Sequence, residues 1–308
     1  MKYGLCCISL QLKKEKLSYQ TMTRKKFLSL DRKDALKIIG DKTINNLNVL
    51  YKTLQQCQSN NWNMRIGSDI VPLLTLPQAN FKLTDLPNYS DIKQMFDICS
   101  NYISNNYIRC SMHPDQFVVL ASKSQSVANK SILELNNHAY IMDLLGLTQS
   151  HYNPINIHMN CFKNEKPTDI IKRFSLNYKK LDVGVKHRLV IENEDKTNSW
   201  NVKQLYAGIF INLGIPITYD SHHHRLNSGN ISEQIAFDLA KSTWTTHKSL
   251  FHFSNGKKSA TDRSHSDYVH TLHNELFDGS VDIEFEFKMK DLAIEKFEGG
   301  KYESRNYI

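Results

Sequence analysis

Four residues with metal-ligand chemistry follow one apolar segment. The segment Ile209–Ile217 leads into Asp220, and His222, His223 and His224 come shortly after it. Apolar runs of this kind are typical of buried parallel strands, and α/β proteins build their sites at the C-terminal ends of such strands. A carboxylate and imidazoles at such an end indicate a metal site. The Asp-x-x-His spacing favours His223 as the ligand, and either neighbouring histidine could instead bind a substrate phosphate.

Similar side chains stand at or just after the ends of other apolar segments. They are His113, His158, Glu192, His252, His265 and Glu286. With Asp220 and His223 they make eight ligand-type groups, too many for one ion. At four to six donors per ion, and with Glu192 as a bridge, they suit two or three divalent ions. We expect Glu192, Asp220 and Glu286 to be the catalytic carboxylates.

A structural explanation competes for each of these histidines. A lone histidine at a strand end is more often a hydrogen-bonded structural residue than a ligand. Charged groups are rarely placed inward on apolar strands without partners, however, and here this happens on successive strands. The joint pattern therefore favours a metal centre. The remaining histidines are predicted to be ordinary surface or packing residues: His138, His151, His187, His247, His270 and His273.

The elements that must position these groups alternate along the chain. Strands are predicted at residues 2–10, 63–72, 107–112, 155–159, 188–192, in the segment ending at Asp220, and at 250–253 and 281–287. Helical patterns follow them at 47–54, 91–107, 135–142, 171–181, 202–209, 231–239, 269–277 and 292–297, with Ser266 or Asp267 as N-cap of the seventh. Residues 11–32 are expected to form a loop with short helical pieces. Eight such units predict a TIM (β/α)8 barrel, a single domain over residues 1–308.

Composition narrows the functional class. The chain has 308 residues, a net charge of +8 and a pI near 9.0, which favours an acidic partner such as a phosphate backbone. Its six cysteines form no CxxC pair, so neither a zinc knuckle nor a disulfide framework is indicated. No signal peptide, membrane span or glycine-rich nucleotide motif occurs. A soluble protein of the reducing cytoplasm is expected.

Several segments together carry a resemblance to a known family. They run in order from residue 2 to 296 and are Arg65-Ile-Gly-Ser-Asp-Ile-Val-Pro72, Met112-His-Pro-Asp-Gln116, Ile157-His-Met159, Arg188-Leu-Val-Ile-Glu-Asn193, Asp220-Ser-His-His-His224, His252-Phe-Ser254, His265-Ser-Asp-Tyr268 and Asp282-Ile-Glu-Phe-Glu-Phe-Lys288. The set resembles the UV damage endonucleases, TIM-barrel relatives of the endonuclease IV type of abasic-site nuclease.

The resemblance implies a reaction and a ligand arrangement. The expected reaction is incision of the phosphodiester 5′ to UV photoproducts, and also at abasic sites, leaving a 3′ hydroxyl. Manganese is the expected ion, with zinc, cobalt or magnesium as substitutes. By resemblance, one ion is held by His113, His158 and Glu192. Glu192 bridges to a second ion held with Asp220, His252 and Glu286, and His223 and His265 hold a third.

Lesion recognition is the part in which this chain departs from its relatives. The expected DNA- and lesion-binding residues are Gln116, Phe117, Leu5, Lys257 and Lys258. In the family a glutamine-tyrosine pair probes the damaged dinucleotide; here the pair is Gln116-Phe117, and a plain packing role for the phenylalanine is the alternative. Leu5 replaces a tyrosine of the relatives, so one aromatic contact is expected to be missing.

Two further departures lie near the expected metals. Leu76 stands where relatives carry a histidine, and Leu250 where they carry a lysine that is modified in some of them. The metal ligands are nevertheless expected to hold and the lesion range to differ.

The expected setting is that of a repair enzyme. The partner is damaged double-stranded DNA, with no membrane and no protein partner, and the chain is expected to be a monomer. The expected location is the cytoplasm of a bacterial or phage-infected cell, in association with the nucleoid. A metal-dependent sugar isomerase or epimerase of the same barrel class is the main alternative. A DNA-binding protein that has lost catalysis is the other.

Overall fold

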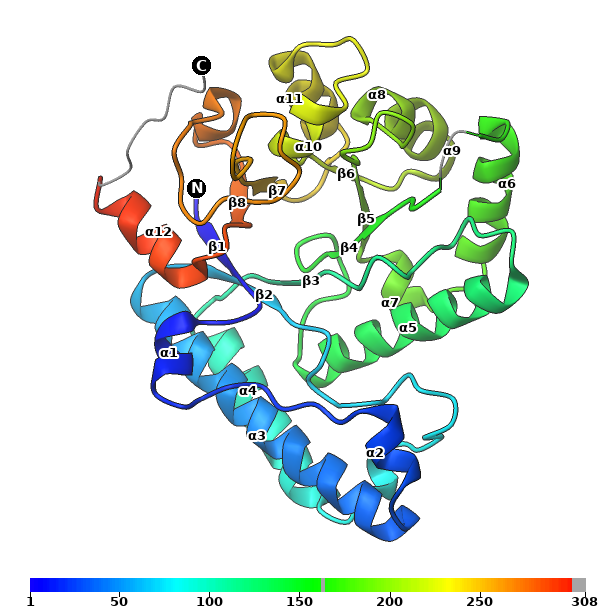
Figure 1. Ribbon diagram of the computed structural model, residues 1–308, viewed down its shortest axis with the longest axis vertical. Helices are drawn as coiled ribbons and strands as arrows, with labels where there is room; N and C mark the ends of the chain where they lie inside the picture. The colour runs from blue at the N-terminus through cyan, green and yellow to red at the C-terminus, as the bar shows by residue number, and fades with distance from the viewer. Residues whose placement is uncertain (162–163, 301–308) are drawn as a thin grey trace.

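Eight parallel strands form a nearly closed barrel in the computed structural model, which describes residues 1–161 and 164–300 (Figure 1). The strands are β1 Tyr3–Cys6, β2 Asn63–Ile66, β3 Cys110–Met112, β4 Ile155–His158, β5 Leu189–Glu192, β6 Ile217–Thr218, β7 Leu250–Phe253 and β8 Asp282–Phe285. Their order is β6-β5-β4-β3-β2-β1-β8-β7. The predicted TIM barrel is confirmed, and each strand is shorter than or equal to its predicted range.

The barrel interior is unusually polar. In β8 the side chains alternate, so that Glu284 contacts Arg65 of β2 and Ser111 of β3 across the interior. Phe285 points the other way and packs against Tyr3 and Phe297. TIM barrels usually fill their interior with branched apolar residues, so buried charges here call for a functional explanation.

The barrel closes weakly between β6 and β7. These two strands share no continuous ladder among the described residues. A single parallel bridge joins Asp220 to His252, and the His252 N–H donates to the Tyr219 carbonyl over 2.9 Å. Two of the predicted metal ligands therefore sit on the seam of the barrel.

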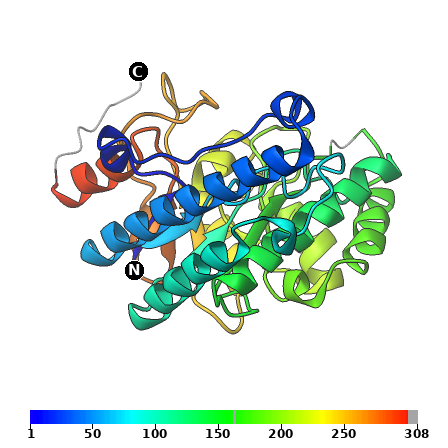
Figure 2. The same cartoon turned by 90° about the horizontal axis from the view of Figure 1, so that it is seen from below.

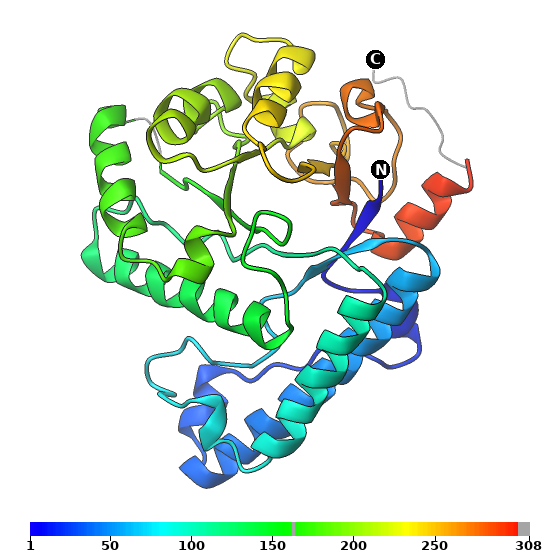
Figure 3. The ribbon, with the colours of Figure 1, turned by 180° about the vertical axis from the view of Figure 1, so that it is seen from behind.

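Helices surround the strands (Figures 1 and 3). The longer ones are α3 Arg32–Ser59, α4 Tyr89–Asn105, α5 Gln125–Leu144, α6 Pro167–Tyr178, α11 Glu233–Ser242 and α12 Lys290–Glu298. Short ones are α1 Leu10–Lys14, α2 Arg24–Leu28, η1 Leu83–Asp85, α7 Val183–Lys186, α8 Val202–Leu205, α9 Ile211–Leu213, α10 Ser221–Leu226 and η3 Asn274–Phe277, with a π-helical turn η2 at Tyr206–Phe210. Figure 2 shows α3 and α4 lying side by side. No helix in these described ranges is long and apolar enough to cross a bilayer.

The predicted helix at residues 269–277 is wrong. Only Asn274–Phe277 is helical there, as a 3-10 turn. The Asn255 side chain accepts from the backbone N–H groups of His270 and Thr271 and donates to the Thr271 carbonyl. This side chain replaces helical backbone bonding, because an asparagine amide can satisfy both donors and acceptors of a loop.

Candidate metal centre

The expected ligands converge at the C-terminal ends of the strands. Ligand atoms of three groups lie within 4.8 Å of one another, and the groups share members. They are His113 with His158 and Glu192, Glu192 with Asp220 and His223, and Asp220 with His252 and Glu286. The structure thus brings together seven of the eight predicted ligands.

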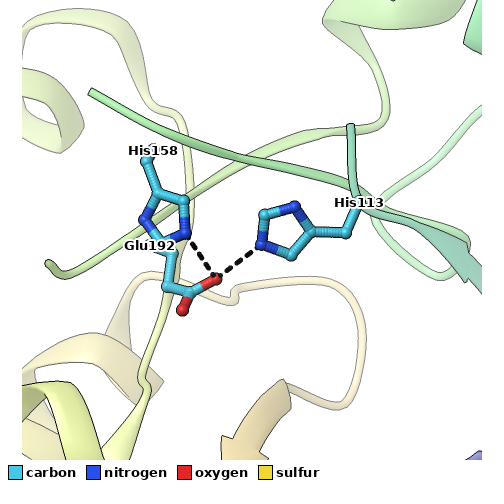
Figure 4. Close-up of side chains that lie close together, drawn as sticks. All are labelled: His113, His158 and Glu192. Carbon is cyan, nitrogen blue, oxygen red and sulfur yellow. Dashed lines mark hydrogen bonds and ion pairs between the residues drawn. The ribbon is translucent and has the colours of Figure 1, made fainter. Parts of the chain in front are cut away.

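The first group comes from the ends of β4 and β5 and the loop after β3 (Figure 4). His113 Nε2 lies 3.2 Å and His158 Nε2 3.8 Å from Glu192 Oε2. His113 Nδ1 lies 3.0 Å from the Pro114 carbonyl, to which its N–H donates a hydrogen bond, so that Nε2 keeps a lone pair for a ligand. That tautomer is the one an ion between these residues requires.

The second group depends on the start of α10. Asp220 caps this helix by accepting from the His223 N–H over 2.7 Å. Because successive helical residues point about 100° apart, the three histidines point in different directions. His223 Nδ1 lies 3.1 Å from Glu192 Oε1, whereas His222 Nε2 donates to the Asp262 carbonyl.

His222 and His224 are both buried at 1% exposure. This burial favours a packing role for both residues over the alternative in which one of them binds a substrate phosphate. The spacing argument for His223 agrees with the geometry, since its ring is the one that faces Glu192.

The third group contains atoms without hydrogen-bond partners. His252 Nδ1 lies 3.1 Å from Glu192 Oε2 and 3.3 Å from Glu286 Oε1 but makes no hydrogen bond. The buried Asp220 Oδ2 also has no partner. Buried polar groups are normally satisfied, so a ring nitrogen and a carboxylate oxygen left without hydrogen bonds in one ligand group fit a site for a divalent cation.

His265 lies beside these groups but belongs to none of them. Its Nδ1 is 2.7 Å from the Glu286 carbonyl, which leaves Nε2 as its ligand atom. Its ring centroid lies 6.3 Å from that of His223. The two predicted ligands of the third ion therefore lie near each other, but among the described residues they are not part of one ligand group.

The electrostatics of the centre follow from burial and mutual charge. Burial alone would raise the pKa of Glu192, but the facing histidines, His252 first, hold it well below its usual range. Burial lowers the pKa of His252, yet Glu192 and Glu286 more than offset this and raise it to about 10. The pKa of His223 is likewise raised well above its usual value, against burial, by Asp220 and Glu192. Without cations, protons on these histidines balance the carboxylates.

Comparison with known proteins places the chain in a family. Residues 1–303 match the family model described as UV-endonuclease UvdE. The chain belongs to this family. A UV DNA damage endonuclease of Nostoc sp. is 30% identical over 304 residues, covering 94% of this chain and 87% of that protein.

Solved structures agree with the UvdE assignment. The crystal structure of SacUVDE matches with a TM-score of 0.80 and 27% identity, covering 98% of this chain and 99% of the other. Endonuclease IV from Thermus thermophilus has a TM-score of 0.58 at 11% identity, with coverage of 97% and 98%, and shares the fold. This UvdE family member is therefore a DNA repair endonuclease with DNA as its substrate.

The residues predicted to face DNA divide into two kinds. Phe117 is 74% exposed, and Gln116, Lys257 and Lys258 are also exposed. Leu5, in contrast, is fully buried among the core residues on the outer side of β1. The expectation that Leu5 lies at the DNA surface is therefore wrong: side chains alternate along a strand, and Leu5 takes the face covered by helices.

The other two departures from the relatives are also packing residues. Leu76 is half-buried against the core, and Leu250 is 3% exposed. Neither brings a ligand atom to the centre of this UvdE protein.

Two charged residues of the centre were not predicted from the sequence as site residues. Arg65 and Glu284 are buried beside the ligands: Arg65 contacts His252 and Glu286, and Glu284 contacts His252. The signal for Glu284 was present: Asp282, Glu284 and Glu286 alternate with apolar residues, which predicts three acids on one strand face. No comparable pattern marks Arg65.

Proposed function

We propose that this UvdE family member incises the phosphodiester 5′ to UV photoproducts in duplex DNA, and at abasic sites, leaving a 3′ hydroxyl. Two or three divalent ions, with Mn²⁺ preferred, would be held by the eight ligands. The chain would act as a monomer, without a protein partner. The observation that carries the proposal is the shared position of Glu192, whose two carboxylate oxygens face ligands of different groups.

The charge of the centre supports more than one ion. Glu284 is balanced by Arg65, which leaves the carboxylates of Glu192, Asp220 and Glu286. Two divalent cations would outweigh these three negative charges. The centre would then attract the anionic DNA backbone, as phosphoryl transfer requires.

The protein residues have distinct tasks in this reaction. His113, His158 and Glu192 would hold one ion, Glu192, Asp220, His252 and Glu286 a second, and His223 with His265 a third. Bound divalent ions would supply activation of water and neutralisation of charge on the phosphoryl group. No side chain among the expected ligands is needed as a general acid. Their work is to hold fixed positions in a buried, low-dielectric site.

Selection of damage is assigned to the loop after β3. The Asp115 carboxylate accepts from the Phe117 N–H over 3.0 Å, which supports an exposed orientation of the Phe117 ring. Inserting a side chain into the base stack costs a few kcal/mol, and least where the stack is already weakened. Gln116 and Phe117 would therefore enter damaged DNA more readily than intact DNA.

Strand nicking tests this function. UV-irradiated, abasic and undamaged duplexes would be incubated with the protein and Mn²⁺, with EDTA as control. We expect metal-dependent incision 5′ to the photoproduct and none in undamaged DNA. Failure of a folded, manganese-loaded protein to nick any duplex would overturn the proposal. A negligible manganese content after supplementation would instead point to a DNA-binding protein without catalysis.

A further inference from the structure

We propose that Glu284 and Arg65 are positioning residues of the metal centre, which hold His252 and Glu286 in the orientation that one divalent ion needs. This inference rests on the proposed metal centre. It concerns two charged residues that none of the ligand assignments use.

Glu284 lies beside His252 in the barrel interior, because the two residues are register partners on the neighbouring strands β8 and β7. Its Oε2 is 3.1 Å from His252 Nε2, on the opposite side of the ring from Nδ1, which faces Glu192 and Glu286. Metal-ligating histidines commonly donate their other N–H to a carboxylate, which fixes the ring orientation and the tautomer. Glu284 is placed to do this for His252.

Arg65 connects Glu284 to the ligand Glu286. Its Nε donates to Glu284 Oε2 over 2.5 Å, and its Nη1 contacts Glu286 Oε1. Its Nη2 also lies 2.8 Å from His252 Nε2. Arg65 is 6% exposed and its guanidinium is planar, so one rigid group fixes two carboxylates and the edge of one imidazole.

The pair also gives His252 Nε2 a partner in either tautomer. When Nδ1 alone carries a proton, Nε2 can accept from Arg65; when both nitrogens are protonated or Nδ1 binds an ion, Nε2–H can donate to Glu284. A ring nitrogen left without a partner in a buried site would be costly. The His252 ring can therefore keep the same orientation in the metal-free and the metal-bound centre.

Charge balance gives the pair a second effect. With Glu284 present, Arg65 is neutralised within the pair. Without the Glu284 charge, Arg65 would have Glu286 as its remaining buried carboxylate partner and would compete with a cation for it. The consequence is specific to the ion at Asp220, His252 and Glu286.

The backbone makes room for this arrangement at Gly4. A Cβ at Gly4 would lie 3.0 Å from Glu284 Cγ and 3.4 Å from its Cα. The first contact is tighter than an ordinary van der Waals contact, so a methyl group at this position would require Glu284 Cγ to shift by a few tenths of an ångström. Gly4→Ala is thus a variant that shifts Glu284 without changing a charge.

The test is metal binding rather than activity. Mn²⁺ would be titrated into the metal-free wild-type chain and Glu284→Gln by calorimetry, with electron paramagnetic resonance to detect coupled ions. We expect Glu284→Gln to weaken one ion by about 10- to 100-fold, the usual effect of losing an outer-shell partner. The ion at His113, His158 and Glu192 should remain, so the tight stoichiometry falls by one and the coupled signal is lost.

Asp282→Asn is the matched control. Asp282 lies two residues earlier on the same strand and pairs with Arg109 over 3.1 Å, and its partners are Lys2, Arg109 and Lys248, not the ligands. It should lower stability while leaving Mn²⁺ stoichiometry and affinity unchanged. Equal loss of metal in both variants would mean a general effect of folding and would overturn the inference.

A double variant distinguishes competition between Arg65 and the cation from loss of the ligand orientation. Arg65→Met with Glu284→Met removes the competing cation together with its partner, so it should bind the second ion more tightly than Glu284→Gln does. Gly4→Ala should weaken the same ion while retaining every charge. If Glu284→Gln and Gly4→Ala both bind Mn²⁺ as the wild-type chain does, the positioning role is wrong. If the wild-type chain itself binds no ion, the proposed function fails instead.

Discussion

Glu192 is the side chain on which the centre depends most. Its carboxylate faces His113, His158, His223 and His252, and its pKa lies well below the usual range because of these histidines, against the effect of burial. The bridging role proposed for Glu192 would need both oxygens. Glutamine keeps the shape but offers only one oxygen and no charge.

We therefore expect Glu192→Gln to reduce nicking of irradiated duplex by at least about 10³-fold, the order of one lost major catalytic interaction. DNA binding, measured by fluorescence anisotropy, should persist, because binding depends on surface contacts. Asp282→Asn provides the comparison of a buried carboxylate lost from elsewhere in the barrel. Nicking at the full rate by Glu192→Gln would show that Glu192 is not a ligand.

Phe117 and Gln116 are expected to govern discrimination. Changing both to alanine should lower the ratio of affinities for damaged and intact duplex by about 10-fold, since aromatic stacking on a base contributes roughly 1–3 kcal/mol. Total affinity for intact duplex should change less. Tyr107→Ala is the control, because Tyr107 is an 82% exposed aromatic that precedes β3 at the opposite end of the strand. An unchanged ratio in the double variant would exclude the insertion model.

At the scale of elements, α12 joins the segment that follows β8 to the segment that follows β1. Asp291, at the start of α12, accepts from the Ser9 hydroxyl over 2.6 Å and from the backbone N–H groups of Leu10 and Gln11. Asp291 thus satisfies the first turn of α1, which lies about 280 residues away in sequence. The contact attaches the loop after β1 to the segment between β8 and α12 that contains Glu286.

Asp291→Asn is expected to lower the free energy of unfolding by roughly 2 kcal/mol at pH 7, as for hydrogen bonds to a charged group. Burial alone would raise the pKa of Asp291, but the bonds from Ser9 and the Gln11 and Leu10 N–H groups hold it below its usual value. A lowered folded-state pKa gives stability that is present above the unfolded pKa and lost as pH falls through the folded one. The difference between wild type and variant should therefore shrink at acidic pH in denaturant titrations. A difference independent of pH would contradict this account.

The order of strands and helices could be predicted because periodicity is a local signal. The segment Leu250–Phe253 has the predicted bounds, and the alternation that predicted the barrel is confirmed. The helix predicted at 269–277 failed because Asn255, a distant side chain, satisfies that backbone. A single sequence does not reveal such a partner.

The sequence allowed prediction of those site residues that lie at the C-terminal ends of predicted strands. Seven predicted ligands meet, because parallel strands present their C-terminal ends on one rim. Leu5 was expected to face the DNA, but its side chain lies on the buried face of β1. Which face a strand residue takes depends on the register of the strand, which the sequence around Leu5 does not determine. Arg65 was missed because its role depends on Glu284 and Glu286, both from the other end of the chain.

For the whole molecule, the net charge of +8 should appear in the salt dependence of DNA binding. Lys257 and Lys258 are exposed in the loop that the Gly256–His265 bridge holds beside the centre. Replacing both with glutamine should make the slope of log K against log salt shallower by about 2, if each releases one counterion. Lys93→Gln on α4, whose ammonium pairs with Asp97, should leave the slope unchanged. An unaltered slope in the double variant would remove these lysines from the DNA interface.

Divalent ions should also stabilise the whole fold. At 100 times the dissociation constant, a ligand that binds only the folded state adds about 2.7 kcal/mol. Mn²⁺ should therefore raise the apparent Tm by roughly 5 °C or more, and EDTA should reverse the change. Because ions must displace protons from His252 and His223, whose pKa values are raised, the stabilisation should be larger at pH 8 than at pH 6. Equal melting with and without Mn²⁺ at pH 8 would contradict this.

Because a single bridge between Asp220 and His252 joins β6 to β7, the barrel wall is held together least strongly between these two strands. Local opening is easiest where the fewest hydrogen bonds must break, and here that place is formed by two of the predicted metal ligands. An ion bound by both residues would cross-link β6 and β7. The metal-loaded barrel would then open at this place less often than the metal-free barrel. Thermal motion of the metal-free chain would then concentrate at the place where the substrate phosphate must be held still.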